Sequence, residues 1–219
     1  MAKVYLSPSD QESNVYAYDN TNEAVQCGRI AEACRAALER SGVEVKVGHM
    51  ISMAQKCSES NAFGADLHVP IHTNAFNGKV MGTRMFCYSA GGKGMAACKA
   101  IFARLAPITP GESENIQVNA DYYEVRVPAA PTAYIECEFH DTVEGAKFIV
   151  ENTVLIGETI ARGICDYFGV KFVEKPKPPA GATIYRVQVG AYTKKENAEN
   201  MLSKLKKDGY SGFIVEGKL

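Results

Sequence analysis

The feature that most limits the fold of this chain is the alternation of strand-like and helix-like segments over residues 1–171. The strand-like runs are short and apolar, whereas the helix-like runs repeat apolar residues three and four positions apart. We expect strands at 3–6, 43–47, 65–71, 82–88, 122–127 and 132–139, helices at 23–40, 50–61, 94–105 and 151–168, and a helical turn at 143–148. This order predicts an α/β fold whose twisted, largely parallel sheet is flanked by helices.

The composition changes abruptly near residue 174, where proline and lysine alternate. Such a segment is stiff and extended and packs poorly, so it marks a domain boundary. We predict a main domain at 1–171, a Pro/Lys-rich linker at 172–182 and a small C-terminal β-α-β module at 183–219. Within the module we expect strands at 184–189 and 212–216 around a helix at 195–207. So short a unit buries little apolar area, so we expect it to dock, to pair or to be held by a ligand.

Charge and composition exclude several classes of partner. The net charge of −1 gives no electrostatic basis for binding nucleic acid or an anionic membrane surface. No apolar run approaches the ~20 residues that span a bilayer, so we expect no membrane insertion. The first residues enter a strand-like segment without a signal peptide, which predicts synthesis in the cytoplasm. The seven cysteines are odd in number and lie mostly among apolar residues, as reduced, buried cysteines do.

One strand-like stretch, 66–78, carries the first candidate site residue. Its apolar residues alternate, and it breaks at an Asn-Gly turn. His72 comes where this strand gives way to a polar loop, a position suited to a metal ligand or an acid/base group. His68 shares its strand face but lies four residues earlier, about 13 Å away by strand rise, so we expect it to pack rather than to share an ion with His72.

Acidic residues from two other segments could join His72. Glu23 begins the helix predicted to follow the first strand, with Asn22 as its cap. A helix start in an open α/β sheet faces the carboxyl edge of the strands, where sites form, although Glu23 could also simply favour the positive helix end. Glu136 and Glu138 lie on one face of a strand that is otherwise apolar. They could be exposed on an edge strand, or one could act as a general base.

Zinc hydrolysis would need residues of these types together. Catalytic zinc takes three nitrogen or oxygen ligands from the protein and lowers the pKa of a water molecule to about 7, and a nearby carboxylate can then take its proton. A second hypothesis is a metal-free glycosidase that uses Glu136 and Glu138 as paired carboxylates. That hypothesis assigns no role to Glu23 or His72.

The chain also resembles the zinc-dependent N-acetylmuramoyl-L-alanine amidases, the type 3 cell-wall hydrolases. The matching segments are 22–24, 60–66, 71–75, 82–83 and 131–139, which occur in the family's order. The resemblance implies cleavage of the amide bond between N-acetylmuramic acid and L-alanine in peptidoglycan. It implies that Glu23 and His72 are metal ligands and that Glu136 is the catalytic carboxylate.

The sequence departs from the family at one metal ligand. The family follows its first strand with Asp-Pro-Gly-His-Gly, and this chain has Ser-Pro-Ser-Asp-Gln at 7–11, so Asp10 stands where the family has histidine. Either Asp10 provides an oxygen ligand, or His140 provides the missing nitrogen from the loop after Glu136, which is the choice we favour. A third possibility is a peptidoglycan-binding protein that kept the amidase fold and lost its metal and its activity.

The C-terminal segment resembles the first half of a SPOR domain, a module that binds peptidoglycan glycan strands. The resemblance rests on 185–192 and on the helix that follows. Because only one β-α-β half is present, glycan binding would be helped if two tails paired, which makes a homodimer a candidate assembly. The sequence thus predicts a bacterial cell-wall amidase, such as an endolysin or autolysin, that acts after export or lysis.

Overall fold

A computed structural model describes residues 1–113, 116–176, 187–207, 210, 212 and 214–215. The chain divides into two compact units, Met1–Lys175 and Pro176–Leu219. Within the described residues, no helix is both long enough and apolar enough to cross a membrane.

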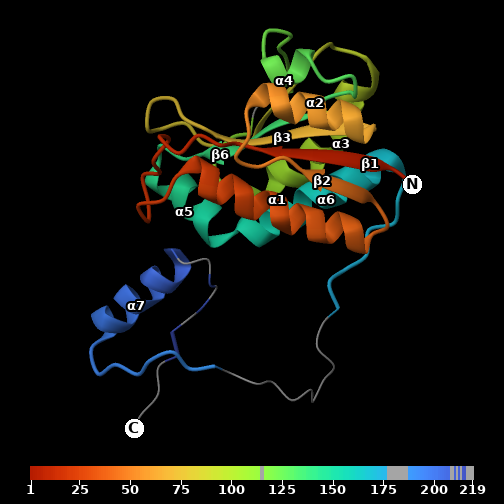
Figure 1. The fold of residues 1–219 in the computed structure, drawn as a ribbon. Helices are drawn as coiled ribbons and strands as arrows, with labels where there is room; N and C mark the ends of the chain where they lie inside the picture. The colour runs from red at the N-terminus through yellow and green to blue at the C-terminus, as the bar shows by residue number, and fades with distance from the viewer. Residues whose placement is uncertain (114–115, 177–186, 208–209, 211, 213, 216–219) are drawn as a thin grey trace. The chain divides into compact units, whose positions relative to one another are not determined.

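A six-stranded mixed sheet forms the centre of the first unit (Figure 1). Its strand order is β2-β1-β3-β6-β4-β5, and every neighbouring pair is parallel except β4 and β6. The strands are β1 (Lys3–Pro8), β2 (Glu44–Val47), β3 (Leu67–Asn74), β4 (Arg84–Cys87), β5 (Gln117–Val118) and β6 (Tyr134–Phe139). The predicted α/β class and largely parallel sheet are confirmed.

The apolar core lies between one face of this sheet and four helices. These helices are α1 (Glu23–Arg40), α3 (Gly92–Leu105), α5 (Val143–Glu151) and α6 (Thr153–Phe168). Asn22 caps α1 as predicted, because its Oδ1 accepts the N–H of Val25 at 3.0 Å. α6 packs against both α1 and α3.

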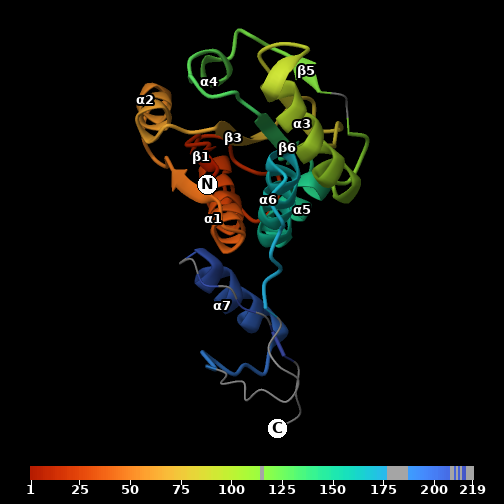
Figure 2. The same ribbon diagram turned by 90° about the vertical axis from the view of Figure 1, so that its right-hand side faces the viewer.

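The other side of the sheet is covered by α2 (Met53–Phe63) and α4 (Tyr123–Arg126), as Figures 1 and 2 show. A single-turn 3₁₀ helix, η1 (Ala106–Ile108), follows α3. Side chains alternate between the faces of a strand, so the apolar Val69 and Ile71 enter the core while His68 and His72 point to the opposite face. That opposite face is where the sheet carries its ionisable residues.

The structure differs from the strand predictions at three places. The segment 122–127, predicted as a strand, contains the short helix α4, whose Glu124 is bonded to side chains of β1 and β3 rather than to a strand ladder. The two-residue β5 was not predicted, since so short a strand leaves no periodic pattern. β6 lies between β3 and β4, so its two glutamates are not on an edge strand.

The second unit contains α7 (Lys195–Lys207), which matches the predicted helix. The predicted strand at 184–189 falls partly outside the described residues, and residues 187–190 have no strand conformation. The predicted strand at 212–216 likewise includes residues outside the description, and 212 and 214–215 are not in a strand. The domain bounds at 171 and 183 and the pairing of two tails stay predictions.

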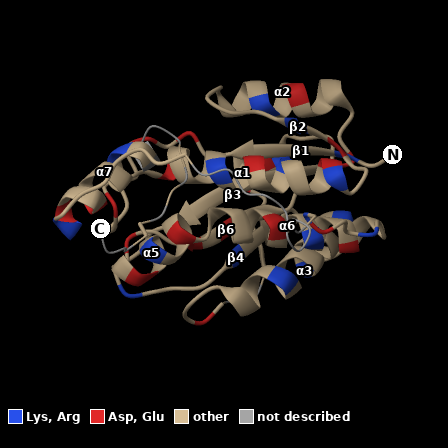
Figure 3. Cartoon of the chain, turned by 90° about the horizontal axis from the view of Figure 1, so that it is seen from below, with Lys and Arg blue, Asp and Glu red and all other residues tan. Residues whose placement is uncertain are grey.

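All seven cysteines are buried and free, as the sequence predicts. Charges of both signs alternate along α1, so this helix presents no patch of a single sign (Figure 3).

Gly157 allows α6 to approach α1 closely, and this contact gives a test of the packing. A Cβ added at Gly157 would lie 2.5 Å from the carbonyl oxygen of Ile30 in α1, and backbone cannot yield cheaply. We expect Gly157→Ala to lower the free energy of unfolding by about 1–3 kcal/mol in denaturant titrations. Gly28→Ala in α1 is the control, because a Cβ added there would contact only the half-exposed ring of His49. Alanine also has a better helix propensity than glycine, so the free energy of unfolding should be unchanged or up to ~1 kcal/mol higher. Equal effects of the two variants would contradict this account.

Candidate active site

Three ionisable side chains meet at the carboxyl end of β3. His72 lies near the end of β3, Glu136 is its register partner on β6, and Glu23 is the first residue of α1. All three are at least nine-tenths buried. The Nδ1 atom of His72 lies 2.9 Å from Oε1 of Glu23. The topology thus brings together the three residues that the sequence selected from separate segments.

The Glu23–His72 pair is held by its surroundings. Asn14 Nδ2 donates to Glu23 Oε2 at 2.6 Å. The ring of His72 stacks on Tyr134 with centroids 4.7 Å apart. Burial alone would raise the pKa of Glu23, but its hydrogen bonds with His72 and Asn14 outweigh burial and hold that pKa below its usual value. Burial opposes the charged form of His72, yet the hydrogen bond to Glu23 and the charge of Glu136 raise its pKa.

Glu136 differs from Glu23 because its carboxyl lacks a compensating bond. Its Oε2 is buried without a hydrogen-bond partner among the described residues. Burial, and to a smaller extent the charge of Glu23, raises the pKa of Glu136 to about 8, although the charge of His72 acts in the opposite direction. A carboxyl whose pKa lies near neutral pH is suited to general acid/base catalysis.

The two candidates for the missing ligand are engaged elsewhere. Both carboxylate oxygens of Asp10 have partners, since Oδ2 lies 2.6 Å from Lys56 Nζ and Oδ1 accepts the N–H of Met50 at 2.7 Å. His140 Nδ1 lies 2.9 Å from the hydroxyl oxygen of Thr73, and burial lowers its pKa. Within the described residues, His140, Glu23 and His72 do not form a group whose ligand atoms all lie within 4.8 Å of one another. The metal role of each stays a prediction.

Glu138 binds backbone N–H groups, which indicates a structural role. Its Oε1 accepts the backbone N–H groups of Gly82 and Phe139, each at 2.7 Å. These bonds fasten the residues before β4 to the end of β6. This arrangement gives no support to a glycosidase in which Glu138 is paired with Glu136.

The titration of Glu138 predicts a change of stability with pH. Burial raises its pKa to about 7, and its backbone hydrogen bonds only partly oppose the shift. The folded chain therefore holds this proton more tightly than the unfolded chain, whose Glu pKa is about 4.3, so stability from this group is lost as pH rises from about 4.3 to 7. Glu138→Gln keeps the accepting oxygen and cannot ionise. Between pH 5 and 8, the free energy of unfolding of Glu138→Gln should therefore rise relative to that of the wild type. One unit of pKa difference between the folded and unfolded chain corresponds to ~1.4 kcal/mol, so the rise should be a few kcal/mol at most. Denaturant titrations at several pH values measure it. A pH-independent difference would contradict the assignment.

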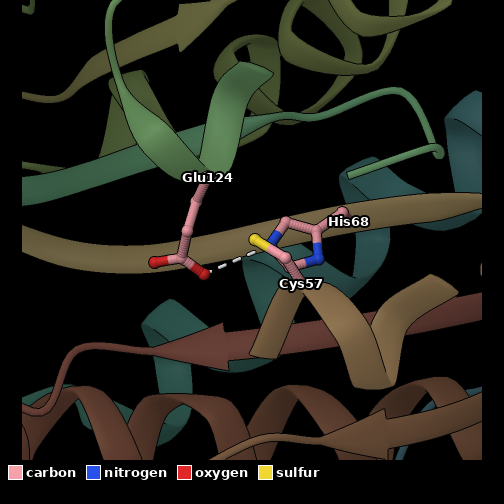
Figure 4. A group of neighbouring side chains, drawn as sticks. All are labelled: Cys57, His68 and Glu124. Carbon is pink, nitrogen blue, oxygen red and sulfur yellow. Dashed lines mark hydrogen bonds and ion pairs between the residues drawn. The ribbon is translucent and has the colours of Figure 1, made fainter. Parts of the chain in front are cut away.

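A second buried polar group lies on the same face, further back along β3 (Figure 4). Cys57, His68 and Glu124 have ligand atoms within 4.8 Å of one another, and no other such group of three occurs in the part of the chain that the structure describes. His68 Nε2 lies 3.2 Å from Glu124 Oε1, which also accepts the hydroxyl of Ser7. Burial opposes ionisation of Glu124, but the bonds from His68 and Ser7 hold its pKa below the usual value. The pair links α4 to β3, and the packing role predicted for His68 agrees with its complete burial.

A double-mutant cycle tests whether this group is a structural ion pair. Replacing His68 or Glu124 alone by Leu leaves a buried, unpaired ionisable partner, at a cost of about 3–5 kcal/mol, whereas replacing both should cost much less than the sum. The loss of the Ser7 bond is common to both variants that lack Glu124, so it cancels in the coupling energy. Additive effects would argue against the pair. A chelator that destabilised the wild type but not Cys57→Ala would instead assign a metal to this group.

Comparisons with known proteins identify the family of this chain. The N-acetylmuramoyl-L-alanine amidase family matches residues 9–166. The chain belongs to this family. Its members are peptidoglycan hydrolases, and the resemblance that the sequence showed is confirmed. The SPOR domain family matches residues 166–216, which confirms the relationship of the C-terminal segment.

Individual relatives extend over nearly the whole chain. The sporulation-specific N-acetylmuramoyl-L-alanine amidase of Bacillus subtilis is 23% identical over 222 residues, which cover 98% of this chain and 85% of the relative. The amidase CwlM of Bacillus licheniformis has the same identity and coverage. The catalytic domain of CwlV from Paenibacillus polymyxa superimposes with a TM-score of 0.70 at 16% identity, covering 78% of this chain and 100% of that domain. This structural likeness shows the shared fold.

Several residues that contact the candidate site were not predicted from the sequence. Gln11, Asn14 and Tyr134 contact the Glu23–His72 pair directly. The two amides lie in the loop after β1, and the only available signal was that this loop joins the first strand to the helix that carries Glu23.

Proposed function

We propose that this chain cleaves the amide bond between N-acetylmuramic acid and L-alanine with zinc as its cofactor. Glu23 and His72 are the protein groups proposed to hold the metal, and Glu136 is the proposed acid/base residue. The observation that supports this assignment best is the buried Oε2 of Glu136, which has no hydrogen-bond partner among the described residues and lies opposite a buried glutamate–histidine pair. When bound, zinc supplies a Lewis acid that polarises the scissile carbonyl and acidifies water.

The donor set is compatible with zinc at two positions. An imidazole nitrogen and a carboxylate oxygen are both zinc ligands, and bonds of 2.0–2.1 Å in tetrahedral geometry place neighbouring ligand atoms ~3.3 Å apart. The separation of 2.9 Å between His72 Nδ1 and Glu23 Oε1 is close to that spacing. A nearby cation would also favour the ionised form of Glu136, because an opposite charge lowers the pKa of a carboxyl.

The remaining steps are assigned to the chain itself. Ionised Glu136 takes a proton from the attacking water, and the protonated carboxyl then donates it to the leaving nitrogen of L-alanine. The burial that raises its pKa keeps the accepted proton on the carboxyl near neutral pH, where it is available for the second transfer. The ring of Tyr134, stacked on His72, fixes the orientation of the imidazole.

The C-terminal unit and the site of action complete the proposal. The SPOR match supports attachment of the second unit to glycan strands of the same polymer. The enzyme would then act at the bacterial cell wall, as an endolysin released on lysis or as an autolysin. Peptidoglycan is the proposed partner of both units.

Replacement of Glu136 by Gln tests the catalytic assignment. The variant removes the transferable proton and keeps the size of the side chain, so we expect release of L-alanine amino termini from purified cell walls to fall by at least about 10²-fold. The free energy of unfolding should not decrease, since the change removes an ionisable carboxyl whose buried Oε2 has no partner in the described part of the chain. Glu138→Gln is the matched control and should retain most of the activity.

Undiminished amine release by Glu136→Gln would overturn this role for the residue. New reducing ends without new amino termini would indicate a glycosidase. Binding to cell walls without either product, by the wild type, would indicate an inactive binding protein.

A further inference from the structure

The loop after β1 places a different residue at the candidate metal site from the one that the family alignment selects. Asp10 is the residue aligned with the family's histidine, but its carboxylate pairs with Lys56, whose ammonium group is almost fully buried. Lys56 Nζ also donates to the carbonyl of Pro8 at 2.6 Å. Turning Asp10 toward His72 would leave a buried ammonium without its counter-ion, which is strongly unfavourable.

The side chain of Gln11, the next residue, reaches His72. Its Nε2 lies 3.4 Å from His72 Nδ1, the atom that also faces Glu23 Oε1 at 2.9 Å. With the Gln11 amide rotated so that its oxygen takes the place of Nε2, both distances would be close to the ~3.3 Å expected between ligand atoms around a tetrahedral zinc ion. Three side-chain groups from β3, α1 and the loop after β1 therefore converge on one point.

The hydrogen bonds around this point are in conflict. Asn14 Nδ2 donates to the Glu23 carboxylate at 2.6 Å and to Gln11 Oε1 at 3.0 Å, so the Gln11 amide turns its nitrogen toward His72. A protonated Nδ1 satisfies Glu23 but opposes the Gln11 donor, and a bare Nδ1 has the reverse problem. A cation bound between the lone pair of Nδ1 and the carboxylate removes the conflict. Rotation of the Gln11 amide about its terminal torsion then presents its oxygen.

We propose that Gln11 takes the place of the family's third ligand histidine and binds a divalent metal through its amide oxygen, together with Glu23 and His72. This inference rests on the metal site of the proposed function. A neutral amide oxygen is a weaker zinc ligand than imidazole, and rotation of the amide also gives up the bond from Asn14. Two oxygen donors and one nitrogen therefore bind zinc more weakly, and prefer it less over manganese, than a site with two histidines does.

Metal affinity measured without substrate tests this proposal. Zinc and manganese dissociation constants are determined by competition with a chromophoric chelator in a Cys57→Ala background, which removes one ligand of the buried Cys57–His68–Glu124 group. Gln11→His should tighten zinc binding at least about tenfold and increase the preference for zinc over manganese, and Gln11→Ala should weaken binding by a similar factor. Ser13→His adds an exposed histidine to the same loop and should change neither constant. The absorption spectrum of cobalt-substituted Gln11→His should differ from that of the cobalt-substituted parent protein in the way expected for one additional nitrogen ligand.

The outcomes separate this inference from the proposed function. If zinc binding needs Glu23 but is the same in wild type, Gln11→His and Gln11→Ala, Gln11 is not a ligand while the metal site stands. If His140→Ala weakens binding and Gln11→Ala does not, His140 is the third ligand. If the Cys57→Ala protein with no other change binds no zinc, both the Gln11 inference and the proposed zinc dependence fail. Unfolding midpoints of the metal-free variants show whether each one is folded.

Discussion

The arrangement of this chain depends on one constraint, that an ionisable side chain buried against the sheet needs a partner. Burial of a lone charge costs several kcal/mol, so such groups pair or stay neutral. Lys56 pairs with Asp10, His68 with Glu124 and His72 with Glu23. Glu138 accepts two backbone N–H groups instead. Glu136 and Glu138 each keep one buried carboxylate oxygen without a hydrogen-bond partner among the described residues. Of these two, Glu136 is the register partner of His72 near the carboxyl end of β3.

The same constraint explains why the family motif changes as it does in this chain. A histidine at position 10 could not neutralise Lys56, and an aspartate that does so cannot turn toward His72. The loop after β1 therefore divides two tasks between neighbours. Asp10 balances a buried charge beneath the loop, and Gln11 reaches the candidate site. The exchange at position 10 is thus coupled to the role proposed for Gln11.

Much of the fold could be predicted because β3 and β6 carry a clear period of two and α1 and α6 a clear helical period. The same patterns failed at α4, where tertiary bonds of Glu124 to Ser7 and His68 decide the conformation of a short segment. The convergence of Glu23, His72 and Glu136 followed from the rule that parallel strands end at one edge. The neighbours that hold them did not follow, because which way Asp10 and Gln11 point depends on Lys56, more than forty residues away in the sequence.

The residues of the candidate site differ in how much of each is exposed to solvent. Glu23 is 1% exposed, His72 8% and Glu136 9%, whereas Gln11 is an exposed residue of the loop after β1. The two proposed ligands that bind most strongly are thus fixed by packing before any metal arrives, and the weakest one stands next to solvent. Rigid inner ligands keep the geometry that hydrolysis requires, since small displacements of reacting groups are costly.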